Sequence, residues 1–149
     1  MTGTPVVKGP CTFSENAGFV TELQNLINNE RAANGLTPLS VNQQLVAAAK
    51  AHGNDMLCNN YYSSVAPNGS NPESRVQAQG YTASLVFENL FARTAINDVT
   101  PLAALNYWMN DPAQRAQLLN PTTTHIGIAY LSSNQSLFGA YFVLITAKQ

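Results

Sequence analysis

A single carboxylate inside an apolar run is the most informative chemical feature of this sequence. Glu88 lies within Leu-Val-Phe-Glu-Asn-Leu-Phe (residues 85–91), and such a run of large apolar residues is typical of a buried extended segment. Burial of an unpaired carboxylate is costly, so Glu88 must be protonated, paired with a cation or open to a cleft.

The chain has only two histidines, His52 and His125. His52 falls on the apolar stripe of a helical segment, where a histidine is more often a buried core residue than a ligand. His125 begins a segment of alternating polarity, from which it could turn into a cleft, face solvent or cover a helix. A Ser-His-acid triad could be assembled with Ser63, Ser64 or Ser84 as the nucleophile, but nothing in the sequence singles one out.

Composition excludes several classes of function. The chain has 149 residues, which is enough for one domain with a sizeable core. Charged residues make up 10% and the net charge is -1, so there is no basic field to hold nucleic acid or anionic head groups. No apolar run reaches the roughly 18 residues that would cross a bilayer, and the first residues lack the apolar core of a signal peptide. A chain from which a signal had been removed would look the same.

Helix caps and breakers divide the chain into an arm, residues 1–13, and a single domain, residues 14–149. The first helix is predicted to start at a Ser14 cap and to stop at Gly35. A second helix starts at Ser40 or Asn42, with Gln43 placed for a capping box with Ser40. Three shorter helices are predicted from an Asn71 cap to Gly80, after Thr100-Pro101, and from an Asp111 cap to Asn120.

Strand patterns fill the remaining segments. Residues 85–91 form one strand candidate, and residues 126–130 alternate with a period of two. Residues 132–136 form a turn, and residues 137–146 a long apolar strand, so the last two strands are expected to pair as a hairpin. This order of helices and strands predicts an α+β fold with a mostly antiparallel sheet covered by helices.

Five patterns, taken in order, resemble the bacterial branch of the CAP superfamily, which includes cysteine-rich secretory proteins, antigen 5 and pathogenesis-related 1 proteins. The longest is Trp-Met-Asn-Asp-Pro-Ala-Gln-Arg-Ala-Gln-Leu-Leu-Asn-Pro, residues 108–121. It is similar to the family's Trp-Met-Asn-x-Pro-x-His-Arg-x-x-Leu-Leu-Asn-Pro. The other four are residues 26–31, 63–70, 88–90 and 126–128, and the resemblance reaches over residues 19–146. It implies a three-layer α-β-α sandwich in a protein that is secreted or held on the cell envelope.

In many members of that family, two histidines and acidic residues hold a divalent metal such as zinc in a cleft. The resemblance places the histidine positions at Ser64 and Gln114 and one acid at Glu88. Asp111 could be the second acid, although its place before Pro112 favours a helix cap. A hydroxyl, an amide and one carboxylate make a poor zinc site, so we expect no metal and no other cofactor.

The remaining cleft then needs another partner for Glu88. Arg115 is predicted to be this partner, because the family's His-Arg pair puts the arginine on the same helix as the cleft residue. The cleft residues expected from the resemblance are Ser64, Glu88, Asp111, Gln114, Arg115 and His125.

Two cysteines, Cys11 and Cys58, leave two interpretations open. They could be separate buried thiols, or one disulfide that ties the N-terminal arm to the end of the second helix. The even count and the family's secreted habit favour the disulfide. Neither cysteine has the spacing of a zinc site.

The resemblance and the missing histidines predict a secreted, periplasmic or surface-held domain that binds rather than catalyses. The expected ligand is a lipid, a sterol-like molecule or another envelope component, bound by a monomer without nucleic acid. The alternatives are a hydrolase, assisted by metal through Glu88, Asp111 and His125, and a protein–protein interaction module that uses Tyr61 and Tyr62. The fold alone does not distinguish these functions, because one fold can host many of them.

Overall fold

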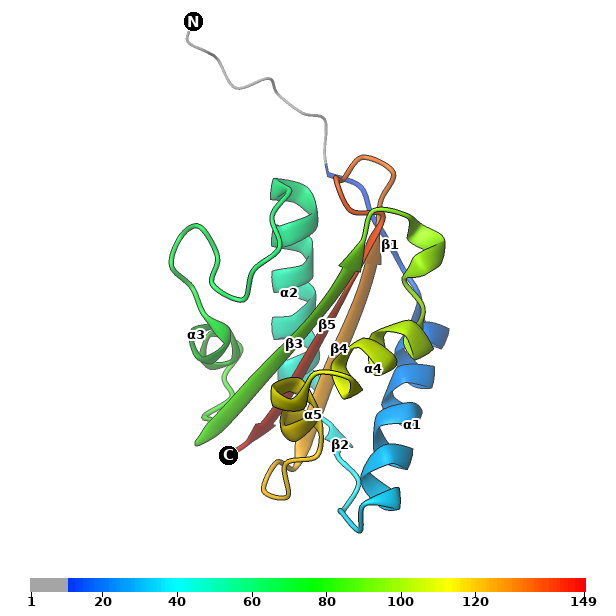
Figure 1. The fold of residues 1–149 in the computed structure, drawn as a ribbon. Coiled ribbons are helices and arrows are strands. Elements are labelled where there is room, and N and C mark those ends of the chain that lie inside the picture. The colour runs from blue at the N-terminus through cyan, green and yellow to red at the C-terminus, as the bar shows by residue number, and fades with distance from the viewer. Residues whose placement is uncertain (1–10) are drawn as a thin grey trace, which may run out of the picture.

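The structure, a computed structural model, describes residues 11–149 and has three layers with a sheet in the middle (Figure 1). The strands are β1 (Ser14–Glu15), β2 (Ser40–Val41), β3 (Leu85–Arg93), β4 (His125–Ser132) and β5 (Ala140–Lys148). They run in the order β1-β4-β5-β3, and β2 also pairs with β4. Among the described residues only the pairing of β2 with β4 is parallel. The predicted α+β sandwich with a mostly antiparallel sheet is confirmed.

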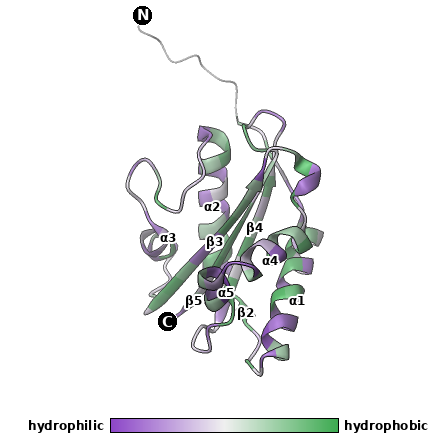
Figure 2. Cartoon of the chain, viewed as in Figure 1, coloured by the Kyte–Doolittle hydropathy of each residue, from purple (hydrophilic) through white to green (hydrophobic). Residues whose placement is uncertain are grey.

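Helices cover both faces of this sheet. On one face lie α1 (Ala17–Ala33), α4 (Pro101–Met109) and α5 (Pro112–Leu118), whose apolar residues form one core with alternate residues of the strands. On the other face lie α2 (Gln43–Asn59) and α3 (Pro72–Ala78), which share a second core with the intervening strand residues. A short 3-10 turn, η1 (Ile96–Asp98), precedes α4. The strands are largely hydrophobic, whereas the helices carry polar stretches (Figure 2). Within residues 11–149, no helix is both long and apolar enough to cross a bilayer.

The first helix begins later than predicted, and the second begins at Asn42, the later of its two predicted caps. Asn16 caps α1 by accepting a hydrogen bond of 2.9 Å from the Phe19 amide, and Asn42 caps α2. The serines expected as caps belong to strands instead, because Ser14 pairs with Ser132 and Ser40 with His125 of β4. The predicted capping box between Ser40 and Gln43 is therefore wrong. Strand pairing with β4 engages the backbone of both serines, so each helix starts only after its serine.

Helix α2 packs very closely on β4 because of a glycine. A Cβ atom at Gly127 would overlap the backbone of Leu45 and Val46, so only glycine allows this approach. Further along α2, Gly53 lies in the same way against the Leu131 side chain. This close packing brings the neighbouring His52 against the sheet, where its side chain is 1% exposed.

Candidate functional site

Glu88 lies in β3 and points to the layer formed by α2 and α3. Its side chain is 1% exposed, and its carboxylate is paired with Arg75 of α3. The Arg75 Nη2 atom donates to both carboxylate oxygens, at 3.1 Å from Oε1 and 3.0 Å from Oε2. The predicted partner was wrong, because Arg115 is exposed on α5, which belongs to the opposite layer.

Arg75 also holds the loop that joins α2 to α3. Its Nη2 atom donates to the Ser64 carbonyl at 2.7 Å, and Nη1 donates to the Ser70 carbonyl at 3.2 Å. One buried guanidinium thus fastens both ends of this loop to the carboxylate of β3. The Ser64 hydroxyl also faces Glu88, so the structure brings together two of the residues expected in the cleft.

The pKa of Glu88 reflects these neighbours. Burial raises the pKa of the Glu88 carboxyl, whereas the charge and hydrogen bonds of Arg75 and the hydroxyl of Ser64 lower it. Glu73 raises it a little further through its negative charge. The balance is a carboxyl whose pKa lies above its usual value and whose two oxygens already have a partner. Such a group is engaged in holding the structure and is poorly available as a ligand or proton donor.

His52 completes the charged cluster on this face. Its Nε2 atom lies 2.8 Å from the Ser63 carbonyl and 3.6 Å from Glu88 Oε1. Burial, followed by the positive charge of Arg75, lowers the pKa of His52 to about 4. The ring is therefore neutral at pH 7, and it must carry its proton on Nε2 in order to donate to Ser63. The prediction that His52 is a buried core residue is confirmed.

Asp55 and Tyr61 extend the cluster toward solvent. The Tyr61 hydroxyl donates to the Asp55 carboxylate, and its ring centroid lies 6.0 Å from that of His52. Burial and this hydrogen bond raise the pKa of the Tyr61 hydroxyl. Asp55 follows His52 by three residues on the same helix face, a spacing that could have indicated their association from sequence.

The other expected cleft residues lie on the opposite side of β3. Asn89 follows Glu88 and so points to the other layer, where its Nδ2 atom donates to Gln114 Oε1 at 3.2 Å and Gln117 Oε1 at 3.0 Å. Gln114 in turn donates to Asp111 at 3.0 Å. Asp111 is the N-cap residue of α5, as predicted, but its side chain bonds Gln114 and no backbone amide of the helix.

His125 belongs to neither group. It starts β4, and its Nδ1 atom lies 2.8 Å from the hydroxyl of the buried Tyr81. The six residues expected in one cleft are thus spread over three environments. Ser64 and Glu88 lie together, Asp111, Gln114 and the exposed Arg115 belong to the α5 segment, and His125 lies beside Tyr81.

This arrangement does not fit a zinc ion. No group of three or more His, Cys, Asp or Glu side chains within residues 11–149 could hold a metal. The two positions that hold histidines in the family present a hydroxyl and an amide here. At Glu88 the positive charge of Arg75 occupies the place where a cation would bind, so electrostatic repulsion opposes a metal at this carboxylate.

Tyrosines line the far half of β3. The hydroxyl of Tyr62 and the indole nitrogen of Trp108 both donate to the Leu90 carbonyl at 2.9 Å. Tyr62 is 39% exposed and Tyr107 is 42% exposed, and the guanidinium of Arg93 lies 5.0 Å from the Tyr107 ring. We call Tyr62, Arg93 and Tyr107 the aromatic rim. It offers accessible rings and one cation beside the sheet edge.

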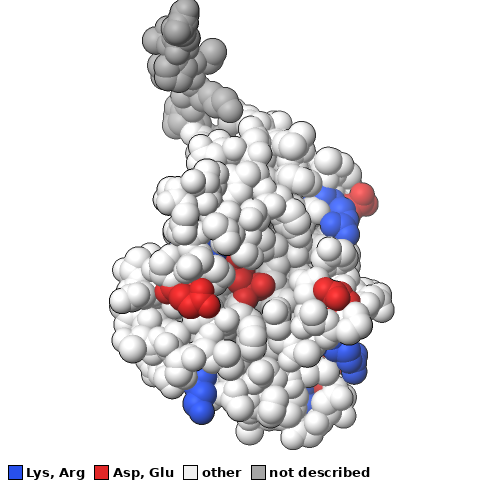
Figure 3. All heavy atoms as spheres, turned by 60° about the vertical axis from the view of Figure 1, so that its left-hand side comes forward, with Lys and Arg blue, Asp and Glu red and all other residues white. Residues whose placement is uncertain are grey.

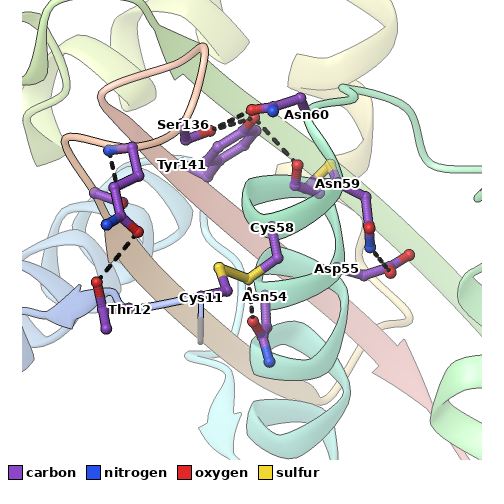
Figure 4. Close-up of a disulfide and its surroundings, with 12 residues drawn as sticks. Cys11, Thr12, Asn54, Asp55, Cys58, Asn59, Asn60, Ser136 and Tyr141 are labelled. Atoms are coloured by element: carbon purple, nitrogen blue, oxygen red, sulfur yellow. Dashed lines mark hydrogen bonds between the residues drawn. A yellow bond between two sulfur atoms is a disulfide. The ribbon is translucent and has the colours of Figure 1, made fainter. Parts of the chain in front are cut away.

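Cys11 and Cys58 form a disulfide, and their Cα atoms are 5.7 Å apart. Cys58 lies near the end of α2, and Cys11 precedes β1 (Figure 4). The bond confirms the pairing that the even cysteine count and the family's secreted habit favoured. The rest of the predicted arm, residues 1–10, lies outside the described residues.

Comparison with known proteins agrees with this architecture. The profile of the cysteine-rich secretory protein family, CAP, matches residues 24–146. The uncharacterized protein YkwD of Bacillus subtilis strain 168 is 31% identical over 120 residues, which cover 80% of this chain and 45% of that protein. The uncharacterized membrane protein YlbC of the same strain is 31% identical over 107 residues, covering 72% of this chain and 30% of that protein. The chain thus spans less than half the length of these curated relatives.

Solved structures share the fold. An extracellular protein of Bacillus anthracis that contains an SCP domain superimposes with a TM-score of 0.75 and 26% identity, over 89% of this chain and 41% of that one. An outer surface protein of Borrelia burgdorferi gives a TM-score of 0.81 at 20% identity, over 93% of this chain and 99% of that one, a likeness of fold alone. The matching profile covers most of the chain in a continuous stretch, and the ordered motifs fall within it. The chain therefore belongs to the bacterial branch of the CAP, or cysteine-rich secretory protein, family.

Proposed function

We propose that this chain is a non-catalytic binding domain that acts outside the cytoplasm and holds a lipid or sterol-like component of the cell envelope. One observation carries the proposal. The acid that would serve a metal or a reaction, Glu88, is 1% exposed and has both oxygens bonded to Arg75. The best candidate for chemistry is therefore engaged in holding the fold together.

A hydrolytic role finds no support in the serines beside His52. The His52 Nε2 atom faces the carbonyl oxygen of Ser63, at 2.8 Å, and not a hydroxyl. The Ser63 hydroxyl instead accepts a hydrogen bond of 3.2 Å from the Val65 amide. With its pKa at about 4, His52 has little tendency to take a proton at neutral pH.

The disulfide supports a location outside the cytoplasm, because such bonds persist in oxidising compartments and are rare in reducing ones. Two structural relatives agree, since the Bacillus anthracis protein is extracellular and the Borrelia burgdorferi protein is an outer surface protein.

The aromatic rim supports an amphiphilic ligand. Tyr62 and Tyr107 offer exposed rings that an apolar body could cover, and Arg93 would complement an anionic head group. Burial, followed by the nearby Tyr107, raises the pKa of Tyr62 to about 12, so its hydroxyl stays protonated and can keep donating to Leu90.

Native mass spectrometry of the folded chain tests this proposal, with zinc chloride and a lipid extract of bacterial envelopes as separate probes. We expect a lipid adduct and no stoichiometric zinc adduct. The variant Tyr107→Ser should lose at least half of the lipid adduct, whereas Arg115→Ala, changed on an exposed residue of another helix, should retain it. A one-to-one zinc adduct that disappears in Glu88→Gln would overturn the proposal and restore the metal-assisted enzyme.

A further inference from the structure

The outer edge of β3 has two unlike halves. The hydrogen bonds of β3 show which of its residues direct their backbone groups away from the sheet. The Leu90 carbonyl accepts from the side chains of Tyr62 and Trp108, so it points outward. The Arg93 carbonyl, an odd number of residues further on, accepts from the Gly139 amide next to β5, so it points into the sheet. Since backbone groups alternate along a strand, Val86, Glu88, Leu90 and Ala92 direct their amides and carbonyls outward. The carbonyls of Leu90 and Ala92 are covered by side chains, the latter by Arg93 Nη1 at 2.8 Å.

The first half of the edge is uncovered. Among the described residues, no hydrogen bond reaches the backbone of Val86 or Glu88 from outside the sheet. Glu88 is informative, because its side chain is 1% exposed and yet the residue as a whole is only partly buried. The accessible surface of Glu88 therefore belongs to its backbone, which presents a donor and an acceptor at the strand edge.

A pocket adjoins this open half. It has a volume of about 340 Å³ and lies between α3 and the start of β3. Glu73 and Gln77 of α3 form one wall, and Ser84, Leu85 and Val86 form the other. Glu73 is exposed and has no salt bridge within residues 11–149. Glu73 thus brings to the pocket a negative charge that forms no ion pair with the residues described.

We propose that an extended peptide with a basic side chain adds to the open edge of β3 as a further strand. Its backbone would pair with Val86 and Glu88, and its lysine or arginine would enter the pocket beside Glu73. This inference is independent of the lipid ligand proposed above, which would occupy the aromatic rim on the covered half of the edge.

Three observations favour a peptide over other occupants. The outward amides and carbonyls of Val86 and Glu88 are spaced as in a strand, so the backbone of another strand can pair with them. A lipid has no such series of donors and acceptors. The α3 wall and the covered Leu90 leave room for only a few residues, about five at 3.4 Å each, and a second copy would bring its own flanking helix into the same space. The surface around this side carries separate acidic groups and no large basic patch, which favours a cationic segment (Figure 3).

Amide exchange measured by NMR on the whole chain tests the proposal directly. The probe is a synthetic seven-residue peptide of alternating valine and lysine, acetylated and amidated, and the control is the same peptide with every backbone amide methylated. We expect the amides of Val86 and Glu88 to exchange at least tenfold more slowly with the probe and to be unaffected by the methylated control, which cannot pair as a strand.

Two matched pairs of variants sharpen the test. Val86→Pro removes the outward amide but no bond to β5, whereas Val86→Thr keeps that amide, so the first should weaken peptide binding at least tenfold relative to the second. Glu73→Gln should weaken the lysine peptide three- to fivefold and leave a valine–serine peptide unchanged. If Val86→Pro fails to fold, the exchange data and Glu73→Gln still decide.

Other results would overturn the inference. These are equal binding of the methylated peptide, no protection of Val86 and Glu88 at millimolar peptide, or protection that grows with protein concentration alone. The last would assign the edge to a second copy of the chain.

Discussion

Two buried arginines, one on each side of the sheet, do similar work with different partners. Arg75 joins the loop after α2 to Glu88, a full negative charge. Arg31 of α1, which is 0% exposed, donates only to carbonyls, from Nε to Thr37 at 2.9 Å and from Nη1 to Leu118 and Asn120 at 2.9 Å each. Leu118 ends α5, where the helix dipole gives the carbonyls a partial negative charge.

Glu88 acts as a structural counter-ion, a role that the Arg31 side of the sheet fills with carbonyl groups alone. On the Arg31 side, a buried guanidinium organises chain segments without any acid, so a structural arginine needs no catalytic setting. The Arg75 side looks more like a reactive site only because a carboxylate is present. Its geometry, two segments held by one guanidinium, is the same as that around Arg31.

The largest loss of stability is expected from removing the negative charge that pairs with Arg75. Glu88→Gln leaves the Arg75 charge buried without a counter-ion and should lower the free energy of unfolding by about 3–5 kcal/mol. Urea denaturation at pH 7 would measure it. Arg115→Ala is the control and should stay within about 0.5 kcal/mol, because that side chain is exposed. Adding Arg75→Met to Glu88→Gln should recover most of the loss, and a double variant worse than both single ones would contradict the comparison.

A smaller loss of stability is expected from changing Arg31, whose hydrogen-bond partners are neutral carbonyls. Arg31→Lys keeps the charge, but one ammonium group cannot reach three carbonyls that the planar guanidinium serves from two nitrogens. The free energy of unfolding should fall by about 2–3 kcal/mol, again by urea denaturation. An unchanged midpoint would mean that Arg31 contributes through charge alone, and the parallel with Arg75 would fail.

The stability of the fold should also depend on pH, through the titration of His52 and Glu88. The pKa of His52 is about 4 in the fold, mainly because of burial, and about 6.5 when unfolded. The unfolded chain therefore binds the proton more readily, so the stability from neutral His52 is present above pH 6.5 and is lost as the pH falls toward 4. The raised pKa of Glu88 acts in the opposite sense, because the folded state retains that proton to higher pH.

The variant His52→Gln separates these effects, since glutamine can donate to Ser63 and does not titrate. Between pH 7 and pH 4 the unchanged protein should lose about 3 kcal/mol more than this variant. Thermal unfolding at several pH values would measure the difference. Parallel pH profiles would show that His52 does not titrate on unfolding in this range.

Local sequence signals predicted most elements, and tertiary partners explain the failures. Thr100 before Pro101 and Asn71 before Pro72 cap helices as expected, since caps depend on neighbouring residues. Ser14 failed as a cap because it pairs with Ser132, more than a hundred residues later. Such a partner has no local signature.

In the candidate site, too, local patterns were reliable and distant partners were not. The apolar run correctly marked Glu88 as a buried carboxylate in need of a partner, but the family pattern led to Arg115 in place of Arg75. The available sequence signal was the place of Arg75 next to Val76, the one large aliphatic residue of an otherwise polar segment, and these two are the buried residues of α3. Alternation along the predicted strand places Glu88 and Asn89 on opposite faces, but no pattern in the sequence shows that α5 covers the face of Asn89 and not that of Glu88.

The position of the disulfide also affects the order in which the molecule can be assembled. β1 pairs with β4, so the two partners emerge from the ribosome far apart in time. The bond between Cys11 and Cys58 needs only the first two helices and can close before β4 has joined the sheet. It holds the segment before β1 against the end of α2, beside which β4 later packs. An oxidising compartment would thus shorten the chain between the two strands, from the whole span between Ser14 and Ser132 to the part that follows Cys58.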